Sequence, residues 1–108
     1  MKHRDLLTRL RRAELRAGAS KFMDQRRAWL NSGTPPLGRS ARQVLDYEQL
    51  LAELQAVQAG TDDGRWPQNR ERLAAAKIRL AAVAAARHGD ESAWDTLRQL
   101  ALARAAAS

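Results

Sequence analysis

Apolar residues recur along this chain with the 3.6-residue period of amphipathic helices, and no segment shows the apolar-polar alternation of a half-buried strand. The first helix, for example, would turn Leu6, Leu7 and Leu10 to one side. The pattern predicts helices over Lys2–Ala17, from a cap at Ser20 through Leu30, over Ala41–Ala59, from Pro67 to about His88, and from Glu91 to about Ala106. We therefore expect an all-α fold, a compact bundle of about five helices.

Residues that start or stop helices stand between these segments. Gly60 and Gly89 follow the third and fourth helices, where a left-handed residue commonly closes a helix. Ser40, with Gln43 at the capping-box spacing, predicts the start of the third helix. Asp90 is placed to cap the fifth.

The fourth helix is unusual because it is apolar nearly all round. Such a helix must be central in the fold or shared with a partner, and a homodimer with twofold symmetry is the commonest form of sharing. One stripe comprises Leu73, Ala76, Leu80 and Val83, and another comprises Ala74, Ala75, Ile78, Ala82 and Ala85.

Length and composition narrow the classes of protein. A chain of 108 residues is predicted to form one domain. Within it we distinguish basic N-terminal helices (1–27), a central segment (28–60) and a C-terminal helix pair (67–106). Without Cys there is neither a disulfide framework nor a thiolate metal site. No apolar run approaches the length of a membrane span and no signal-peptide core is visible, so we expect a cytoplasmic protein with no membrane partner.

Charge is distributed unevenly. Residues 1–45 hold 11 Lys or Arg against 3 acidic residues, whereas residues 46–63 hold 5 acidic residues and no Lys or Arg. The basic part could follow nucleic-acid phosphates without reading bases, could steer the chain to an acidic protein, or could be an ordinary solvated face. The candidate phosphate contacts are Arg9, Arg12, Arg16, Arg26 and Arg27.

The sequence contains no residue pattern that is typical of an enzyme active site. His88 lies at a helix end, where a protonated His meets the helix dipole favourably, and no second His, Cys or carboxylate pair stands at ligand spacing around it. A helix-turn-helix over 81–102 would place Asp90 and Asp95 at positions that are normally apolar. We therefore predict no catalytic residues, no metal and no cofactor.

The central segment carries the most specific pattern. It contains Trp29-Leu30, then Asn31, Pro35-Pro36 and Leu37-Gly38-Arg39-Ser40, then an apolar helix that closes at Gly60. Pro35 and Pro36 restrict the backbone and Gly38 relaxes it, which predicts a stiff turn with Leu37 at its tip. Leu37 would be folded back over Trp29 or offered outward.

This segment resembles the toxin-binding domain of the Xre/MbcA/ParS type of bacterial antitoxins. Those domains typically run Trp-Leu, a short Asn/Pro stretch, Leu-Gly-Gly-Arg-(Ser/Thr)-Pro, an apolar helix and a closing Gly. The chain lacks the second Gly of that pattern and has Ala41 where the family usually has Pro. The resemblance implies a non-enzymatic protein that binds and neutralises a RES-type toxin acting on NAD.

Several residues are candidates for contact with such a partner. Trp29 fits the core or a hinge as well as a partner contact, and Trp94 fits the core. Trp66, in a polar loop before Pro67, is equally consistent with surface exposure, where Trp is enriched at interfaces. The full candidate set is Trp29, Leu30, Pro36, Leu37, Gly38, Arg39 and Trp66. The alternative function is that of a small basic helical protein associated with nucleic acid, such as a phage or plasmid accessory protein.

Overall fold

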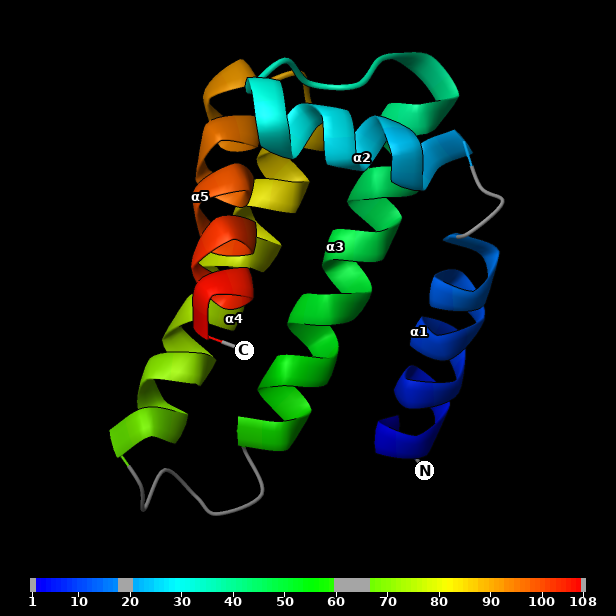
Figure 1. Ribbon diagram of the computed structural model, residues 1–108. Coiled ribbons are helices and arrows are strands. Elements are labelled where there is room, and N and C mark those ends of the chain that lie inside the picture. Colours follow the sequence, from blue (N-terminus) through cyan, green and yellow to red (C-terminus); the bar gives the residue numbers. More distant parts are fainter. Residues whose placement is uncertain (1, 18–20, 60–66, 108) are drawn as a thin grey trace.

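The computed structural model describes residues 2–17, 21–59 and 67–107, and this part of the chain is all-α, with no strand. Its helices are α1 (Lys2–Ala17), α2 (Lys21–Ser32), α3 (Gly38–Ala59), α4 (Pro67–Arg87) and α5 (Glu91–Ala107), shown in Figure 1. The predicted fold class and number of helices are confirmed for these residues. None of the described helices has the length and apolar character needed to cross a membrane.

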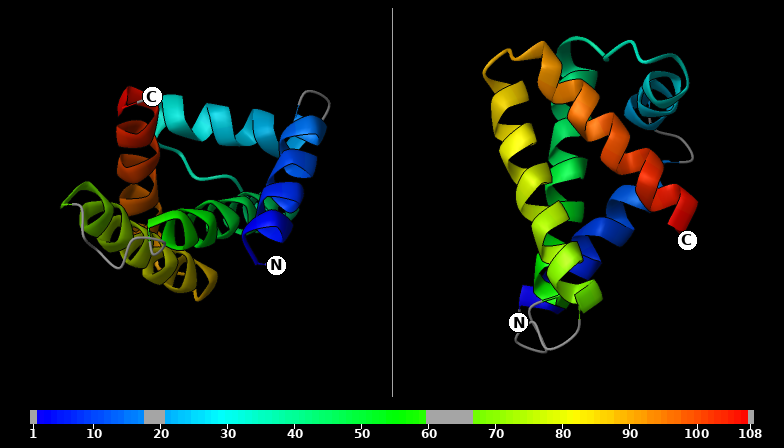
Figure 2. Two further views of the ribbon diagram at one scale, coloured as in Figure 1. Left: turned by 90° about the horizontal axis from the view of Figure 1, so that it is seen from below. Right: turned by 90° about the vertical axis from the view of Figure 1, so that its left-hand side faces the viewer.

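Helix α3 lies at the centre of the bundle. It packs against α1, α2 and α4, whereas α5 packs against α4 and α2. Helices α3 and α4 run antiparallel side by side, and α2 crosses one end of the bundle at a steep angle to α3 (Figures 1 and 2). The prediction that α4 could be central is therefore wrong, because α3 occupies that place and only one side of α4 is deeply buried.

One hydrophobic core joins all five described helices. The largest apolar side chains that are 0% exposed are Trp29, Leu97 and Val44. The predicted core positions Leu6, Leu10 and Trp94 are buried as well. Of the predicted α4 stripe that contains Ile78 and Ala82, Ala82 is buried, while Ile78 is 52% exposed. Sharing of α4 in a homodimer stays a prediction.

The turn between α4 and α5 follows the predicted pattern. Gly89 has a φ of 90° and its N–H donates to Ala86 O, while the Asp90 N–H donates to Ala85 O. This pair of bonds is the Schellman motif, in which a left-handed residue lets the last carbonyls of a helix find donors. The Asp90 carboxylate then accepts from the Ser92 N–H at 3.0 Å and caps α5, as predicted.

The start of α3 differs from the sequence-based prediction. The helix begins at Gly38, so Ser40 lies inside its first turn and the predicted cap at Ser40 is wrong. Gly38 has a φ of 61°, which turns the chain directly from the proline loop into the helix. The predicted roles of Ser20, Gly60 and Trp66 lie outside the described residues.

Candidate functional site

The loop between α2 and α3, residues 33–37, begins at a well-anchored point. The Gly33 N–H donates to Trp29 O at 2.7 Å, and the φ of Gly33 is 81°. Ser32 Oγ donates to Ala28 O at 2.8 Å and accepts from the Thr34 N–H at 3.2 Å. Because these bonds close the end of α2, the following residues leave the helix in a defined direction.

Pro36 and Leu37 face opposite ways in this loop. Pro36 is buried, whereas Leu37 is 86% exposed. Of the two predicted orientations of Leu37, the structure thus has the outward one. A large aliphatic side chain this exposed is supported by no core contact of its own, so its place at the tip of the loop suits contact with another molecule.

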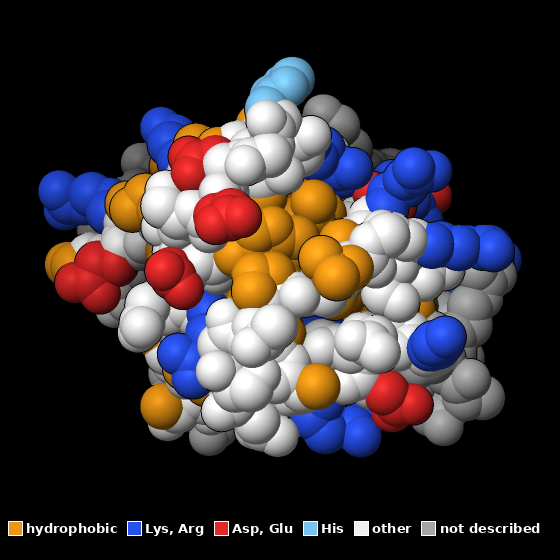
Figure 3. Space-filling model, turned by 90° about the horizontal axis from the view of Figure 1, so that it is seen from above, with side chains coloured by type: hydrophobic (Ala, Val, Ile, Leu, Met, Phe, Trp, Pro, Cys, Tyr) orange, Lys and Arg blue, Asp and Glu red, His pale blue; other side chains and the backbone are white. Residues whose placement is uncertain are grey.

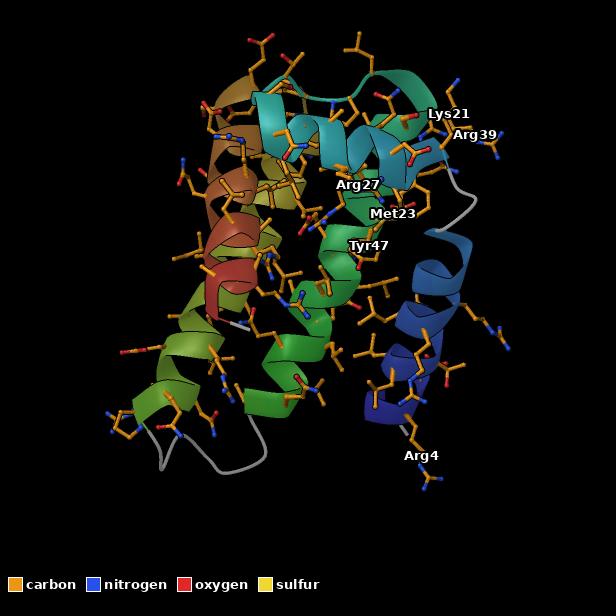
Figure 4. The ribbon with its side chains drawn as sticks, in the orientation of Figure 1. Arg4, Lys21, Met23, Arg27, Arg39 and Tyr47 are labelled. Carbon is orange, nitrogen blue, oxygen red and sulfur yellow. The ribbon has the colours of Figure 1, made fainter. Side chains whose placement is uncertain are left out.

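Basic side chains stand next to Leu37. Lys21, Leu37 and Arg39, with Ser40 and Gln43, line a surface hollow of about 420 Å³. Figure 4 shows Lys21 and Arg39 beside one another at the top of the bundle. In the view of this end of the molecule, hydrophobic side chains gather at the middle of the surface, and Lys and Arg side chains lie toward its edges on both sides (Figure 3).

The two candidate residues at the end of α2 lie beneath this surface. Trp29 is 0% exposed and packs edge to face on Trp94, so the core interpretation is confirmed for both. Leu30 is half-buried, and its carbonyl accepts from Arg98 Nε at 3.1 Å. Trp29 and Leu30 therefore support the loop by joining α2 to α5. Leu37, at the end of the loop, and Gly38 and Arg39, the first residues of α3, are exposed.

The candidate phosphate contacts do not form one cluster. Arg9 and Arg12 are exposed on α1, and Arg27 is exposed on α2, where its Nη1 lies 3.5 Å from Asp24 Oδ1. Arg26 instead turns into the bundle and is only 16% exposed. The side chain of Arg16 lies outside the described part of the structure.

Arg26 belongs to a buried charged cluster that the sequence analysis missed. Its Nη2 lies 2.8 Å from Glu48 Oε1, and its Nε donates to the same oxygen at 3.0 Å. Arg79 Nε lies 3.6 Å from Glu48 Oε2, which is an ion-pair distance but too long for a hydrogen bond. Glu48 is 0% exposed and Arg79 is 3% exposed.

Helical periodicity did contain a signal for this cluster. Glu48 falls on the same face of α3 as the buried Val44 and Leu51, and Arg79 falls between Ala76 and Val83 on α4. A charged residue on a core stripe is rarely buried without a partner of opposite charge. Each position could therefore have been recognised from sequence as a buried charge that needs a partner, but the periodicity does not identify that partner.

The cluster holds two cations against one carboxylate. Burial lowers the pKa of Arg79; the Glu48 carboxylate opposes this effect, while the positive charges of Arg104 and Arg26 add to it. Arg79 Nη1 also reaches Gln55 Oε1 at 3.5 Å. Positive charge is thus in local excess on the inner side of α4.

Within the described residues, no group of three or more His, Cys, Asp or Glu side chains is arranged to hold a metal ion. Comparison of the chain with protein-family models, with curated proteins and with solved structures found no match.

Proposed function

We propose that this chain is a non-enzymatic binding protein of the antitoxin kind, which neutralises a partner protein through the loop between α2 and α3. The single observation that carries the proposal is the 86% exposure of Leu37, on a loop anchored by the buried Pro36. The resemblance of residues 28–60 to antitoxin toxin-binding domains names a RES-type toxin as the partner. The cytoplasm is the compartment in which such a pair would act.

The physical argument rests on preorganisation. An aliphatic anchor on a rigid loop loses little conformational entropy when it enters a pocket of the partner. Gly33 and Gly38, both at positive φ, permit the changes of direction at the two ends of the loop, and the hydrogen bond from the Gly33 N–H to Trp29 O fixes its start. Lys21 and Arg39 beside Leu37 would favour a partner surface that is apolar at its centre and acidic at its rim.

Co-purification tests the proposal. The tagged chain would be co-expressed with a RES-type toxin encoded next to its gene, and recovery of the toxin would be measured together with bacterial growth. The double variant Leu37→Asp/Arg39→Glu should lose toxin recovery and growth protection. Its folding free energy should change by no more than about 0.5 kcal/mol per substitution, because both side chains are exposed.

A matched control makes the same two kinds of substitution, and so the same change in charge, at a site away from the loop. Ile78→Asp/Arg70→Glu alters one exposed apolar and one exposed basic residue on α4 and should leave toxin recovery unchanged. Equal recovery by the loop variant and the parent would contradict the proposal, as would the lack of any toxin reading frame beside the gene.

Nucleic-acid association is the second candidate, favoured by the exposed basic residues Arg9 and Arg12 on α1. Binding to arbitrary duplex DNA through them would fall steeply with salt, with a log-log slope of about −0.9 per phosphate neutralised. We expect weak binding that disappears at moderate salt, since the basic side chains are spread along the bundle. Tight, sequence-selective binding at high salt would reverse the ranking of the two candidates.

A further inference from the structure

A groove of about 610 Å³ lies between α3, α4 and α5, toward the end of the bundle opposite the loop of residues 33–37. Its volume is within the range of about 300–1,000 Å³ that is common for small-molecule sites. Each helix lines the groove with residues three or four positions apart, so one face of each helix points into it. These faces include Leu51 and Leu54 of α3, Ala75 and Arg79 of α4, and Leu100 and Arg104 of α5.

The charge of the lining is predominantly positive. Arg72, Arg79 and Arg104 line the groove, and Glu71 is the one acidic residue among the described lining residues. The remaining polar lining residues are glutamines. Because the apolar part of the lining comes from leucine and alanine side chains, the groove combines a hydrocarbon surface with cationic donors.

Arg79 is the residue of this groove whose polar atoms are least satisfied by the protein. It is 3% exposed, and its Nε forms no hydrogen bond with any described residue. The carboxylate that pairs with it, that of Glu48, is also engaged by Arg26, whose Nε donates to the other oxygen and whose Nη2 lies 2.8 Å from that oxygen. Arg104 adds a further positive charge near Arg79. Glu48 is the shared counter-charge of Arg26 and Arg79, so this buried cluster keeps an excess positive charge. Excess buried charge of one sign is destabilising unless a further anion neutralises it.

We propose that this groove binds a small amphipathic carboxylate, with the carboxylate head against Arg79 and Arg104 and the hydrocarbon tail along Leu51, Leu54 and Leu100. Guanidinium and carboxylate groups match in charge and in planar geometry, and the pair is strengthened away from water. Burial of the tail against the leucines supplies the apolar part of the affinity.

Decanoate is a suitable probe, with decan-1-ol and acetate as its uncharged and tailless counterparts. In a titration followed by ¹H–¹⁵N NMR of the full chain, decanoate should shift amides of 51–58, 72–79 and 100–104 with a saturable Kd below about 1 mM. Decan-1-ol and acetate should each bind at least about tenfold more weakly, because one lacks the charge and the other lacks the tail.

Two variants locate the site. Arg104→Gln changes an exposed side chain and should weaken decanoate binding several-fold without altering the fold. Arg79→Met should weaken it at least about tenfold, and Arg104→Gln carries the test alone if that buried replacement fails to fold. Arg70→Gln removes one exposed charge from α4 outside the groove lining and serves as the matched control. Equal affinity for decanoate and decan-1-ol, unchanged binding by Arg104→Gln, or shifts centred on residues 33–39 would each overturn the proposal.

Discussion

The indole rings of Trp29 and Trp94 meet edge to face, with ring centroids 5.3 Å apart and ring planes inclined by 84°. Trp29 stands near the end of α2 and Trp94 in the first turn of α5. This contact joins the helix that crosses the end of the bundle to the last helix of the chain. The loop whose exposed tip is Leu37 begins at Gly33, whose N–H donates to Trp29 O, so the loop is tied to a fully buried residue of the core.

Loss of this aromatic contact should be among the most destabilising single changes. Trp29→Ala is expected to lower the free energy of unfolding by about 3–5 kcal/mol, because it removes a fully buried ring and leaves a cavity. Urea unfolding followed by circular dichroism measures the effect. Ile78→Ala, at a site that is 52% exposed, is the control and should change stability far less. A loss below about 1 kcal/mol for Trp29→Ala would contradict the packing described for α2.

The buried ion cluster predicts a non-additive pair of substitutions. Glu48→Leu should cost about 3–5 kcal/mol, because it leaves Arg79 buried without its counter-charge. Glu48→Leu combined with Arg79→Met should recover much of that loss, since both buried charges are then gone. The double-mutant cycle is completed with Arg79→Met alone, again by denaturant unfolding. Additive effects would mean that the two residues do not interact.

Asp90 predicts a stability change at acidic pH. The hydrogen bond from Ser92 Oγ, and after it the bond from the Ser92 N–H, lowers the pKa of Asp90 below its ordinary value of about 3.9. A depressed folded-state pKa contributes stability that is fully present above the unfolded-state pKa. That contribution is lost as the pH falls from about 3.9 through the folded-state pKa.

Carboxyl ¹³C NMR of the folded protein should therefore give Asp90 a midpoint below about 3.9, the ordinary value for an aspartate side chain. Asp90→Asn keeps a side chain able to cap α5 and cannot titrate, so its stability should depend less on pH than that of the parent. An unshifted Asp90 midpoint would show that the cap does not form in solution.

Substitution of Gly38 should lower the stability of the protein through backbone strain and not through side-chain crowding. A Cβ at this position would meet nothing within 4 Å, but the φ of 61° is unfavourable for residues with a side chain. Gly38→Ala should therefore cost about 1–2 kcal/mol, and Gly38→Asn should cost less because Asn tolerates the left-handed region. Thermal unfolding of the two variants measures the difference. Equal stability of Gly38→Ala and the parent would mean that the loop relaxes to another conformation.

Much of the fold follows from local chemistry and was predictable for that reason. Apolar spacing identifies all five helices, and Gly89 with Asp90 marks the end of α4 and the start of α5. These signals are local because a helix and its caps depend on residues within about four positions of one another. The positive φ of Gly38 belongs to the same class of prediction.

The relationships between helices came only from the tertiary structure. Periodicity shows that α4 has two apolar faces, but the packing places α3 at the centre and leaves Ile78 half exposed. The outward orientation of Leu37 depends on how the loop meets the first residue of α3, Gly38. The pairing of Glu48 with Arg26 and Arg79 joins residues on three helices. The residues of one helix determine which of its faces is apolar. Which other helix covers that face depends on the lowest free energy of the whole bundle, and so on all the helices together.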